Sequence, residues 1–206
     1  SYYNFFDLVD LGEELHKRGI SPGQVTDVVL THLHFDHCGY STLKNEETGE
    51  IYPAFPNATY WVSRKQWDNF LHPNALEKDS YFIENMKAIA DNGQLRLIDT
   101  DTELCPDIDL RLFDGHTPGQ IVPYIHTPEQ TFVFAGDVIP LAASVSPEWI
   151  SAYDTFPVTS YQEKVRMLEE AAREGQVLIY CHDAYTRCST VKKVNNFFKK
   201  DKTIEI

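Results

Sequence analysis

Residues 31–39 concentrate the side chains that are best able to bind a metal ion. Their sequence is Thr-His-Leu-His-Phe-Asp-His-Cys-Gly, which places His32, His34, Asp36 and His37 within six positions. Imidazole nitrogen and carboxylate oxygen are ligands for zinc, and also for manganese and iron. We therefore interpret this stretch as a metal site rather than as unrelated surface or core residues.

The apolar run Val28-Val29-Leu30 predicts a strand over residues 26–31 that leads directly into this stretch. On extended backbone, His32 and His34 point the same way, because side chains alternate along a strand. Asp36 and His37 then need a turn, which would direct them to a second point nearby. The loop is therefore suited to two metal ions, and further ligands should follow other strands.

Three later residues meet this expectation, because each follows within three positions a segment that is apolar and rich in β-forming residues. They are His116 after residues 109–113, Asp137 after residues 131–135, and His182 after residues 177–181. Taken singly, each is an ordinary turn or strand-end residue. Their shared position at strand ends, together with the loop at 31–39, indicates one metal centre.

The remaining pattern predicts helices alternating with short strands. Helices are expected at residues 5–18, after Ser63 as its N-terminal cap, at 81–91, from Ser160 to Glu174 with its end at Gly175, and at 189–199. Further strands are expected at 58–62, 95–98 and 121–126, with irregular segments at 41–57 and 138–159. This order predicts sheet layers that are covered by helices within one domain.

Composition narrows the class of protein. The 206 residues are 42% hydrophobic and 24% charged, as in an ordinary globular domain, and no apolar run is long enough to cross a bilayer. A net charge of −13 argues against a nucleic-acid partner and favours a small-molecule substrate. The four cysteines show no CxxC pair, which predicts reduced thiols and a cytoplasmic location.

The order of these motifs resembles the metallo-β-lactamase-fold hydrolases over nearly the whole chain. Residues 31–37, 114–119, 136–137 and His182 appear in the family's order, and residues 136–140 and 149–157 resemble in particular the branch of lactonase-like and methyl-parathion-hydrolase-like enzymes. The resemblance implies an α+β fold, a four-layer αββα sandwich, as a single domain over residues 1–206. It also implies that strands normally found before residue 1 are missing, which would expose apolar surface and favour a homodimer.

The resemblance further implies a metal-dependent hydrolase with two divalent ions, most often zinc. The implied ligands are His32, His34 and His116 for one metal, Asp36, His37 and His182 for the other, and Asp137 between them. A metal-bridging hydroxide would cleave a small ester, lactone or phosphoester, and Asp36 would also orient it or shuttle its proton. Lactonases of the fold carry a tyrosine where this chain has Pro140, which has no hydroxyl to offer.

Several alternatives stay open at this point. Trp149, Tyr153 and Phe156 would either wall a substrate pocket beside the metals or simply pack a long loop. Cys38 and Cys181 adjoin ligands, but we expect small buried residues rather than reactive thiols. The alternative functions are a thioester hydrolase of the glyoxalase type, which would need a basic glutathione-binding patch, and an inactive metal-binding fragment.

Overall fold

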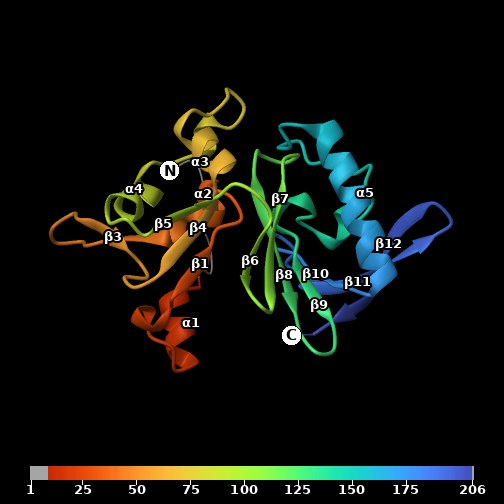
Figure 1. The fold of residues 1–206 in the computed structure, drawn as a ribbon, viewed down its shortest axis with the longest axis horizontal. Coiled ribbons are helices and arrows are strands. Elements are labelled where there is room, and N and C mark those ends of the chain that lie inside the picture. Colours follow the sequence, from red (N-terminus) through yellow and green to blue (C-terminus); the bar gives the residue numbers. More distant parts are fainter. Residues whose placement is uncertain (1–8, 206) are drawn as a thin grey trace. The chain divides into compact units, whose positions relative to one another are not determined.

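The computed structural model describes residues 9–205, which divide into two compact units. Unit 1 comprises residues 9–30, His34–Trp61 and Phe82–Arg96, and unit 2 comprises Thr31–Leu33, Val62–Tyr81 and residues 97–205. Figure 1 shows the helices and strands of both. The division assigns His32 to unit 2, whereas the other ligand candidates of residues 31–39 belong to unit 1.

Unit 1 is built from short elements around a small parallel pairing. β1 (Asp27–Val29) pairs in parallel with β4 (Thr59–Ser63), and β5 (Leu95–Ile98) completes a three-stranded sheet in the order β1-β4-β5. The other elements are α1 (Leu11–Lys17), α2 (Phe35–Cys38), the antiparallel pair β2 (Thr42–Lys44) and β3 (Ile51–Pro53), and α4 (Glu84–Asp91). The short turns η1 (Pro22–Gln24) and η2 (Gly39–Ser41) connect them.

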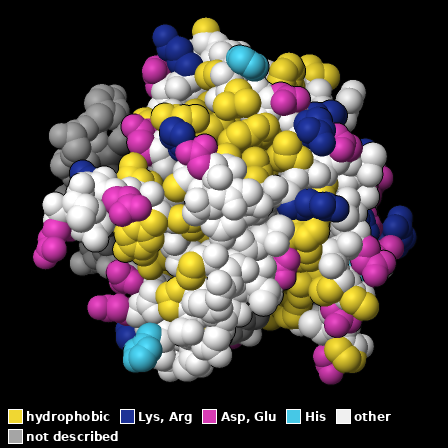
Figure 2. Space-filling view, turned by 60° about the vertical axis from the view of Figure 1, so that its left-hand side comes forward, with side chains coloured by type: hydrophobic (Ala, Val, Ile, Leu, Met, Phe, Trp, Pro, Cys, Tyr) yellow, Lys and Arg dark blue, Asp and Glu magenta, His cyan; other side chains and the backbone are white. Residues whose placement is uncertain are grey.

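The interior of unit 1 is small. Tyr60, Met86 and Ile89 are fully buried, and the Tyr60 hydroxyl donates a hydrogen bond to the Ser41 carbonyl (3.1 Å). Several large hydrophobic side chains of this unit are exposed, namely Val9, Leu11, Ile20, Ile51, Tyr52, Phe82 and Ile83. Figure 2 shows hydrophobic side chains on one face of the surface, among acidic and basic ones. The homodimer that such exposed apolar surface would favour stays a prediction.

Unit 2 is organised around a seven-stranded sheet in the order β12-β11-β10-β9-β8-β7-β6. Its strands are β6 (Thr102–Cys105), β7 (Ile108–Phe113), β8 (Gln120–His126), β9 (Thr131–Phe134), β10 (Val177–Ile179), β11 (Cys188–Val194) and β12 (Phe197–Ile204). All neighbours are antiparallel except β9 and β10. A parallel pair needs a long crossover, and α5 (Pro157–Glu174) lies between these two strands in the chain.

α5 supplies one side of the core of unit 2. Its Met167, Leu168 and Ala171 are buried in one cluster with strand residues such as Val133 and Leu178. The larger of these side chains, such as Met167 and Leu168, each contribute roughly 1.5–3 kcal/mol by leaving water. The helix ends at Gly175, whose φ of +67° suits a left-handed C-terminal cap. No helix within residues 9–205 is long and apolar enough to cross a membrane.

Smaller elements complete unit 2 and carry its functional loops. They are the helix α3 (Arg64–Leu71) and the turns η3 (Lys78–Ser80), η4 (Gly136–Val138) and η5 (Ala142–Ser144). Ser63 caps α3, because its hydroxyl accepts a hydrogen bond from Gln66 N (3.0 Å). The predicted Ser63 cap is therefore confirmed.

The helix predicted at residues 189–199 is wrong. This segment forms the hairpin of β11 and β12, with Asn195 in the left-handed region (φ 55°) at its turn. Asn tolerates this conformation in turns, and the run Ser-Thr-Val before it favours a strand.

Other predicted boundaries also differ. Residues 41–57 contain the strands β2 and β3 rather than only irregular chain, and the strand β6 is not among the predicted strands. The helix α5 begins at Pro157 rather than at Ser160. Proline suits the first turn of a helix because its missing N–H needs no partner there. The part of the first predicted helix before residue 9 lies outside the described residues.

Candidate metal centre

His32 is held in unit 2 by the residues on either side of it. The Thr31 carbonyl accepts a hydrogen bond from Ile121 N (2.7 Å), and Leu33 N donates to the Gln66 side chain (3.2 Å). The Thr31 hydroxyl contacts His32 Nδ1 (3.1 Å), which leaves Nε2 as the nitrogen for a metal. The imidazole is therefore buried and fixed in orientation before any ligand binds.

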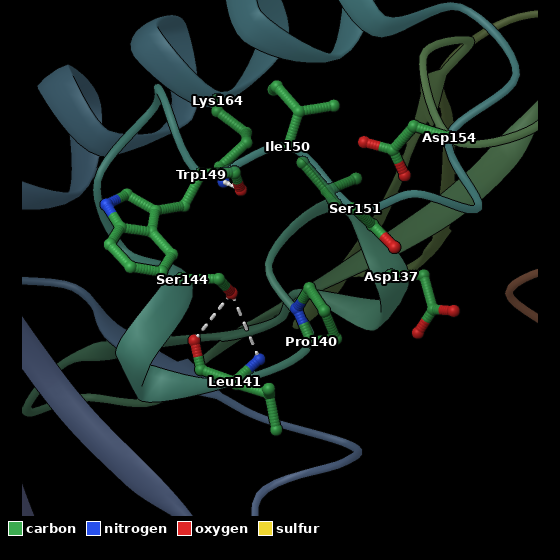
Figure 3. Close-up of a pocket in the computed structure, with 10 residues that line it drawn as sticks. Asp137, Pro140, Leu141, Ser144, Trp149, Ile150, Ser151, Asp154 and Lys164 are labelled. Atoms are coloured by element: carbon green, nitrogen blue, oxygen red, sulfur yellow. Dashed lines mark hydrogen bonds between the residues drawn. The ribbon is translucent and has the colours of Figure 1, made fainter.

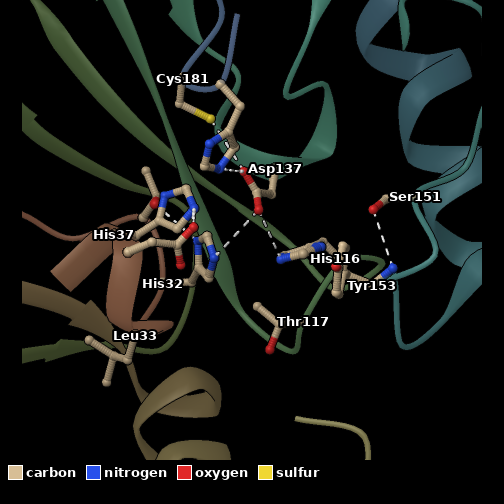
Figure 4. Close-up of polar contacts among 12 residues, drawn as sticks. His32, Leu33, His37, His116, Thr117, Asp137, Ser151, Tyr153 and Cys181 are labelled. Atoms are coloured by element: carbon tan, nitrogen blue, oxygen red, sulfur yellow. Dashed lines mark hydrogen bonds and ion pairs between the residues drawn. The ribbon is translucent and has the colours of Figure 1, made fainter. Parts of the chain in front are cut away.

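The carboxylate of Asp137 lies between three histidines of unit 2, of which Figure 4 labels His32 and His116. Its Oδ2 is 3.3 Å from His116 Nε2 and 3.9 Å from His32 Nε2, whereas its Oδ1 is 3.2 Å from His182 Nε2. Cys181 Sγ also donates to Oδ1 (3.3 Å). Each oxygen of one carboxylate thus faces a different set of imidazoles.

These spacings fit metal ligation. Two ligand atoms that are each ~2.1 Å from a tetrahedral zinc ion are about 3.4 Å apart. The contacts between Asp137 and the nearer imidazoles, 3.2 and 3.3 Å, have this separation. A divalent cation is bound by neutral imidazole and ionised carboxylate, which are the donors that meet here. The donor set is therefore chemically suited to divalent metal.

The backbone loop that carries His116 is fixed by the chain just before α5. Asp154 Oδ1 lies 2.9 Å from His116 Nδ1, and the His116 carbonyl accepts hydrogen bonds from Thr155 N (3.0 Å) and from the Thr155 hydroxyl (2.9 Å). Asp154 is buried, with 3% of its side chain exposed. A carboxylate on Nδ1 sets the tautomer, so that Nε2 is the metal-binding nitrogen.

α5 itself holds the two residues before His116. The Glu163 carboxylate accepts hydrogen bonds from Asp114 N (2.8 Å) and Gly115 N (2.9 Å). Burial raises the pKa of Glu163, although these two bonds to the ionised form lower it. Gly115 lies so close to Ser160 that a Cβ at Gly115 would be 2.4 Å from the Ser160 backbone. The loop can therefore approach the helix only because residue 115 has no side chain.

A buried polar network lies on the other side of the same loop. The Thr117 and Tyr81 hydroxyls both donate to Glu77 Oε2 (2.6 Å each), and Gln66 Nε2 donates to the Thr117 hydroxyl (3.0 Å). Gln66 also accepts the hydrogen bond from Leu33 N. Through Gln66, this network links the segment that carries His32 to the loop that carries His116.

His182 is positioned by the segment after Asp137. Its backbone N–H donates to the Pro140 carbonyl (3.1 Å), and the neighbouring Asp183 accepts from Ala142 N (2.9 Å). Backbone hydrogen bonds from Thr186 and Tyr185 hold the pKa of Asp183 below its usual range. The ionised carboxylate thereby ties the loop after β10 to the loop after β9.

The three remaining ligand candidates lie in unit 1. His34 has extended backbone (φ −61°, ψ 145°) and precedes α2, within which Asp36 Oδ2 lies 3.4 Å from His37 Nε2. The turn predicted at this point is a short helix. Burial raises the pKa of the next residue, Cys38, to about 12, so its thiol is protonated and unreactive at neutral pH.

A model of the metallo-beta-lactamase superfamily matches residues 6–182. The chain belongs to this superfamily. The predicted family and its mixed α/β fold are thereby confirmed, whereas the assignment of individual ligands to two metals stays a prediction.

Curated members of the superfamily resemble the chain over most of its length. An N-acyl homoserine lactonase of Bacillus thuringiensis and AiiA of Bacillus thuringiensis subsp. kurstaki are each 24% identical over 175 residues, which are 82% of this chain. The chain spans about 60% of the length of these lactonases.

Solved structures of the superfamily share the fold. A probable metal-dependent hydrolase from Staphylococcus aureus is 26% identical with a TM-score of 0.81, over 95% of this chain and 69% of that one. The dizinc quorum-quenching lactonase AidC is 21% identical with a TM-score of 0.78, over 95% of this chain and 70% of that one.

Unit 2 of this superfamily member also contains a cavity of about 160 Å³ next to Asp137 (Figure 3). Trp149 lines it, and a contact of Trp149 with substrate stays a prediction. Tyr153 and Phe156 are exposed, with 81% and 46% of their surface accessible, and are not among the residues that line this cavity.

Sequence reasoning did not find the residues that position the ligands of this superfamily site. Asp154 and Glu163, next to and within α5, hold the loop with His116, whereas Lys164 of α5 lines the cavity next to Asp137. Acidic residues at the start of a helix are ordinary, and a lysine in a helix is normally solvated. The sequence carries no local signal for these roles.

Proposed function

We propose that this chain provides the catalytic site of a dinuclear metal-dependent hydrolase that cleaves a small ester, lactone or phosphoester. The observation that carries the proposal is the position of Asp137, whose two oxygens face different histidines. A carboxylate in this position is suited to bridge two cations. Asp137 would hold one ion together with His32 and His116, and the other together with His182.

The remaining ligands would come from α2 and the residue before it. These ligands follow His32 closely in the chain, at His34, Asp36 and His37. Even a fully extended chain could separate the Cα atoms of His32 and His37 by no more than roughly 18 Å. His34 would complete the first site, and Asp36 and His37 the second. This assignment follows the family motif and is part of the proposal.

Two bound divalent cations would activate a water molecule and polarise the carbonyl or phosphoryl oxygen of the substrate. The chain's own residues contribute orientation and proton transfer. Asp36 has 41% of its side chain exposed, which suits a carboxylate that accepts a proton and passes it to solvent. Asp154 keeps the proton of His116 on Nδ1, and the buried positions of His32 and His116 exclude water behind the ligands.

Carbonyl substrates are favoured within this class because the curated relatives are lactonases. The substrate would be a small molecule, and the net charge of −13 again disfavours nucleic acid. A cytoplasmic location, inferred from cysteine usage, belongs to the same proposal.

The proposal is tested by hydrolysis assays on a panel of lactones, aryl esters and phosphotriesters. The protein should be assayed as purified, after chelation, and after Zn²⁺ or Mn²⁺ is added back. We expect turnover of at least one ester or lactone that is lost on chelation and restored by metal. Turnover that survives complete metal removal, or absence of turnover in fully loaded protein, contradicts the proposal.

A further inference from the structure

The cavity beside Asp137 has the dimensions of a binding pocket for part of a small molecule. Its volume of about 160 Å³ is close to the roughly 150 Å³ cavity that holds one benzene molecule in another protein. Much of its wall is apolar, from Pro140, Leu141, Trp149 and Ile150 (Figure 3). It therefore suits a short group of about six non-hydrogen atoms.

Lys164 is the one basic residue that lines this cavity. Only 1% of its surface is accessible, and its Nζ donates a hydrogen bond to the Trp149 carbonyl (2.7 Å). Within residues 9–205 this is its single hydrogen bond, whereas an ammonium group has three N–H donors. A buried ammonium with unused donors is costly unless a ligand supplies acceptors.

The other polar groups on the cavity wall are already engaged. The Ser144 hydroxyl donates to the Leu141 carbonyl (2.8 Å), and the Ser151 hydroxyl accepts from Tyr153 N (3.2 Å). Asp154 is held by His116, and Asp137 belongs to the proposed metal site. The Ser151 hydroxyl keeps its O–H donor, and Lys164 is the cationic group on this wall with N–H donors left for a ligand.

The charge of Lys164 is incompletely balanced by its neighbours. Burial lowers the pKa of Lys164 to about 8, although the carboxylates of Asp154 and Glu148 act in the opposite direction. The two acidic groups thus do not fully replace the water that the ammonium loses. An anionic ligand oxygen would restore this balance, and hydrogen bonds between ionised partners are roughly twice as strong as neutral ones.

We propose that Lys164 binds a carboxylate carried by the substrate, at the end of a short apolar segment that extends from the scissile carbonyl. The carbonyl would lie at the Asp137 end of the cavity, and Pro140, Leu141 and Trp149 would contact the apolar segment. This inference rests on the proposed function and names its substrate class: short esters or lactones with a second, ionised acid group.

Three p-nitrophenyl esters of matched shape test this inference. Their acyl groups come from glutaric acid, which ends in a carboxylate, glutaramic acid, which ends in an amide, and 5-methylhexanoic acid, which ends in two methyl groups. We expect kcat/KM for the glutaric ester to exceed that of the other two by about tenfold or more, the ratio that corresponds to one charge-assisted hydrogen bond. Equal rates, or preference for the amide or methyl ester, overturn the proposal.

Variants of Lys164 assign the preference to this residue. Lys164→Gln keeps an N–H donor for the Trp149 carbonyl but removes the charge, and Lys164→Met removes both. Both should raise KM for the glutaric ester about tenfold and leave the 5-methylhexanoic ester within about twofold. Lys199→Met, on the exposed face of β12, removes one charge away from the cavity and should change neither. Unchanged KM in both Lys164 variants contradicts the proposal.

Binding of glutarate to the full chain separates this inference from the proposed function. Circular dichroism first checks that the wild-type protein and Lys164→Gln are both folded. Calorimetry should then show at least about tenfold weaker glutarate binding in the variant. Glutarate binding at the metals contributes to the affinity of both proteins, so the difference in affinity between them reports the contribution of Lys164. A protein that hydrolyses none of the esters but shows this difference loses the proposed function and keeps the carboxylate site. Equal glutarate binding in both proteins overturns the carboxylate site, whether or not the esters are hydrolysed.

Discussion

Asp154 Oδ1 lies 2.9 Å from Nδ1 of His116, and both side chains are buried, with 3% of each exposed. The two residues are 38 positions apart, so the loop after β7 and the chain before α5 meet at this contact. The carboxylate fixes the imidazole so that Nε2 points to Asp137. A site that is rigid before the metal binds loses less entropy on binding.

Replacing Asp154 should therefore weaken metal binding. Loss of a carboxylate that orients a ligand histidine typically lowers metal affinity 10–100-fold, and we expect this range for Asp154→Ala. Zn²⁺ affinity measured by competition with a chromogenic chelator tests it. Asp99→Ala is a suitable control, because it removes an exposed carboxylate that pairs with Arg64. Equal Zn²⁺ affinity in both variants would show that Asp154 does not orient His116.

Gly115→Ala should destabilise the protein and disturb the same loop. The added Cβ would lie 2.4 Å from Ser160 N and Cα, so the backbone must move. Overpacking of this kind costs about 1–3 kcal/mol, and the displaced loop should also bind metal less tightly. Chemical denaturation with and without Zn²⁺ measures both effects.

Gly23→Ala provides the comparison for this variant. Its nearest contact would be the Asn57 side chain at 3.6 Å, an ordinary van der Waals distance. The control should be neutral or slightly stabilising, because alanine restricts the unfolded chain. If both variants have the same free energy of unfolding, the close packing of Gly115 against α5 is not important for stability.

Lys164→Met should stabilise the protein at neutral pH while it weakens carboxylate binding. The ordinary pKa of lysine is 10.5 and that of Lys164 is about 8, so keeping this ammonium charged in the folded state costs about 3 kcal/mol below pH 8. Methionine fills similar volume without charge, and we expect the free energy of unfolding at pH 7 to rise by up to about 3 kcal/mol.

The gain from Lys164→Met should depend on pH in a defined direction. The cost is fully present below the folded pKa of about 8, and it disappears as pH rises towards 10.5, because the folded state then releases the proton first. The stability difference between Lys164→Met and the wild type should therefore shrink between pH 8 and pH 10.5. A difference that is constant or grows over this range would contradict a buried ammonium at this position.

The parts of the site that were predictable from sequence are those with a local pattern. His116, Asp137 and His182 each follow a strand whose apolar residues are visible in the chain, and the spacing of His32 to His37 is a motif in itself. The Ser63 cap and the Gly175 end of α5 were predictable for the same reason, since capping chemistry is local.

The residues that position the ligands were not predictable, because their partners are distant in sequence. Glu163 binds the backbone of Asp114 across 49 positions, and Lys164 lines a cavity beside Asp137. The lysines of the hairpin of β11 and β12 favour a helix, whereas the run Ser-Thr-Val at its start favours a strand. Pairing with β10, a tertiary contact, decides between these local preferences.

Metal content per chain tests the central claim most directly. Protein loaded with excess Zn²⁺ and freed of unbound metal should contain two zinc ions per chain, as measured by inductively coupled plasma mass spectrometry. Asp137→Ala should retain at most one, because it removes the carboxylate that faces both sets of histidines. Wild-type protein that holds fewer than two ions, or an Asp137→Ala variant that still holds two, would contradict the dinuclear site.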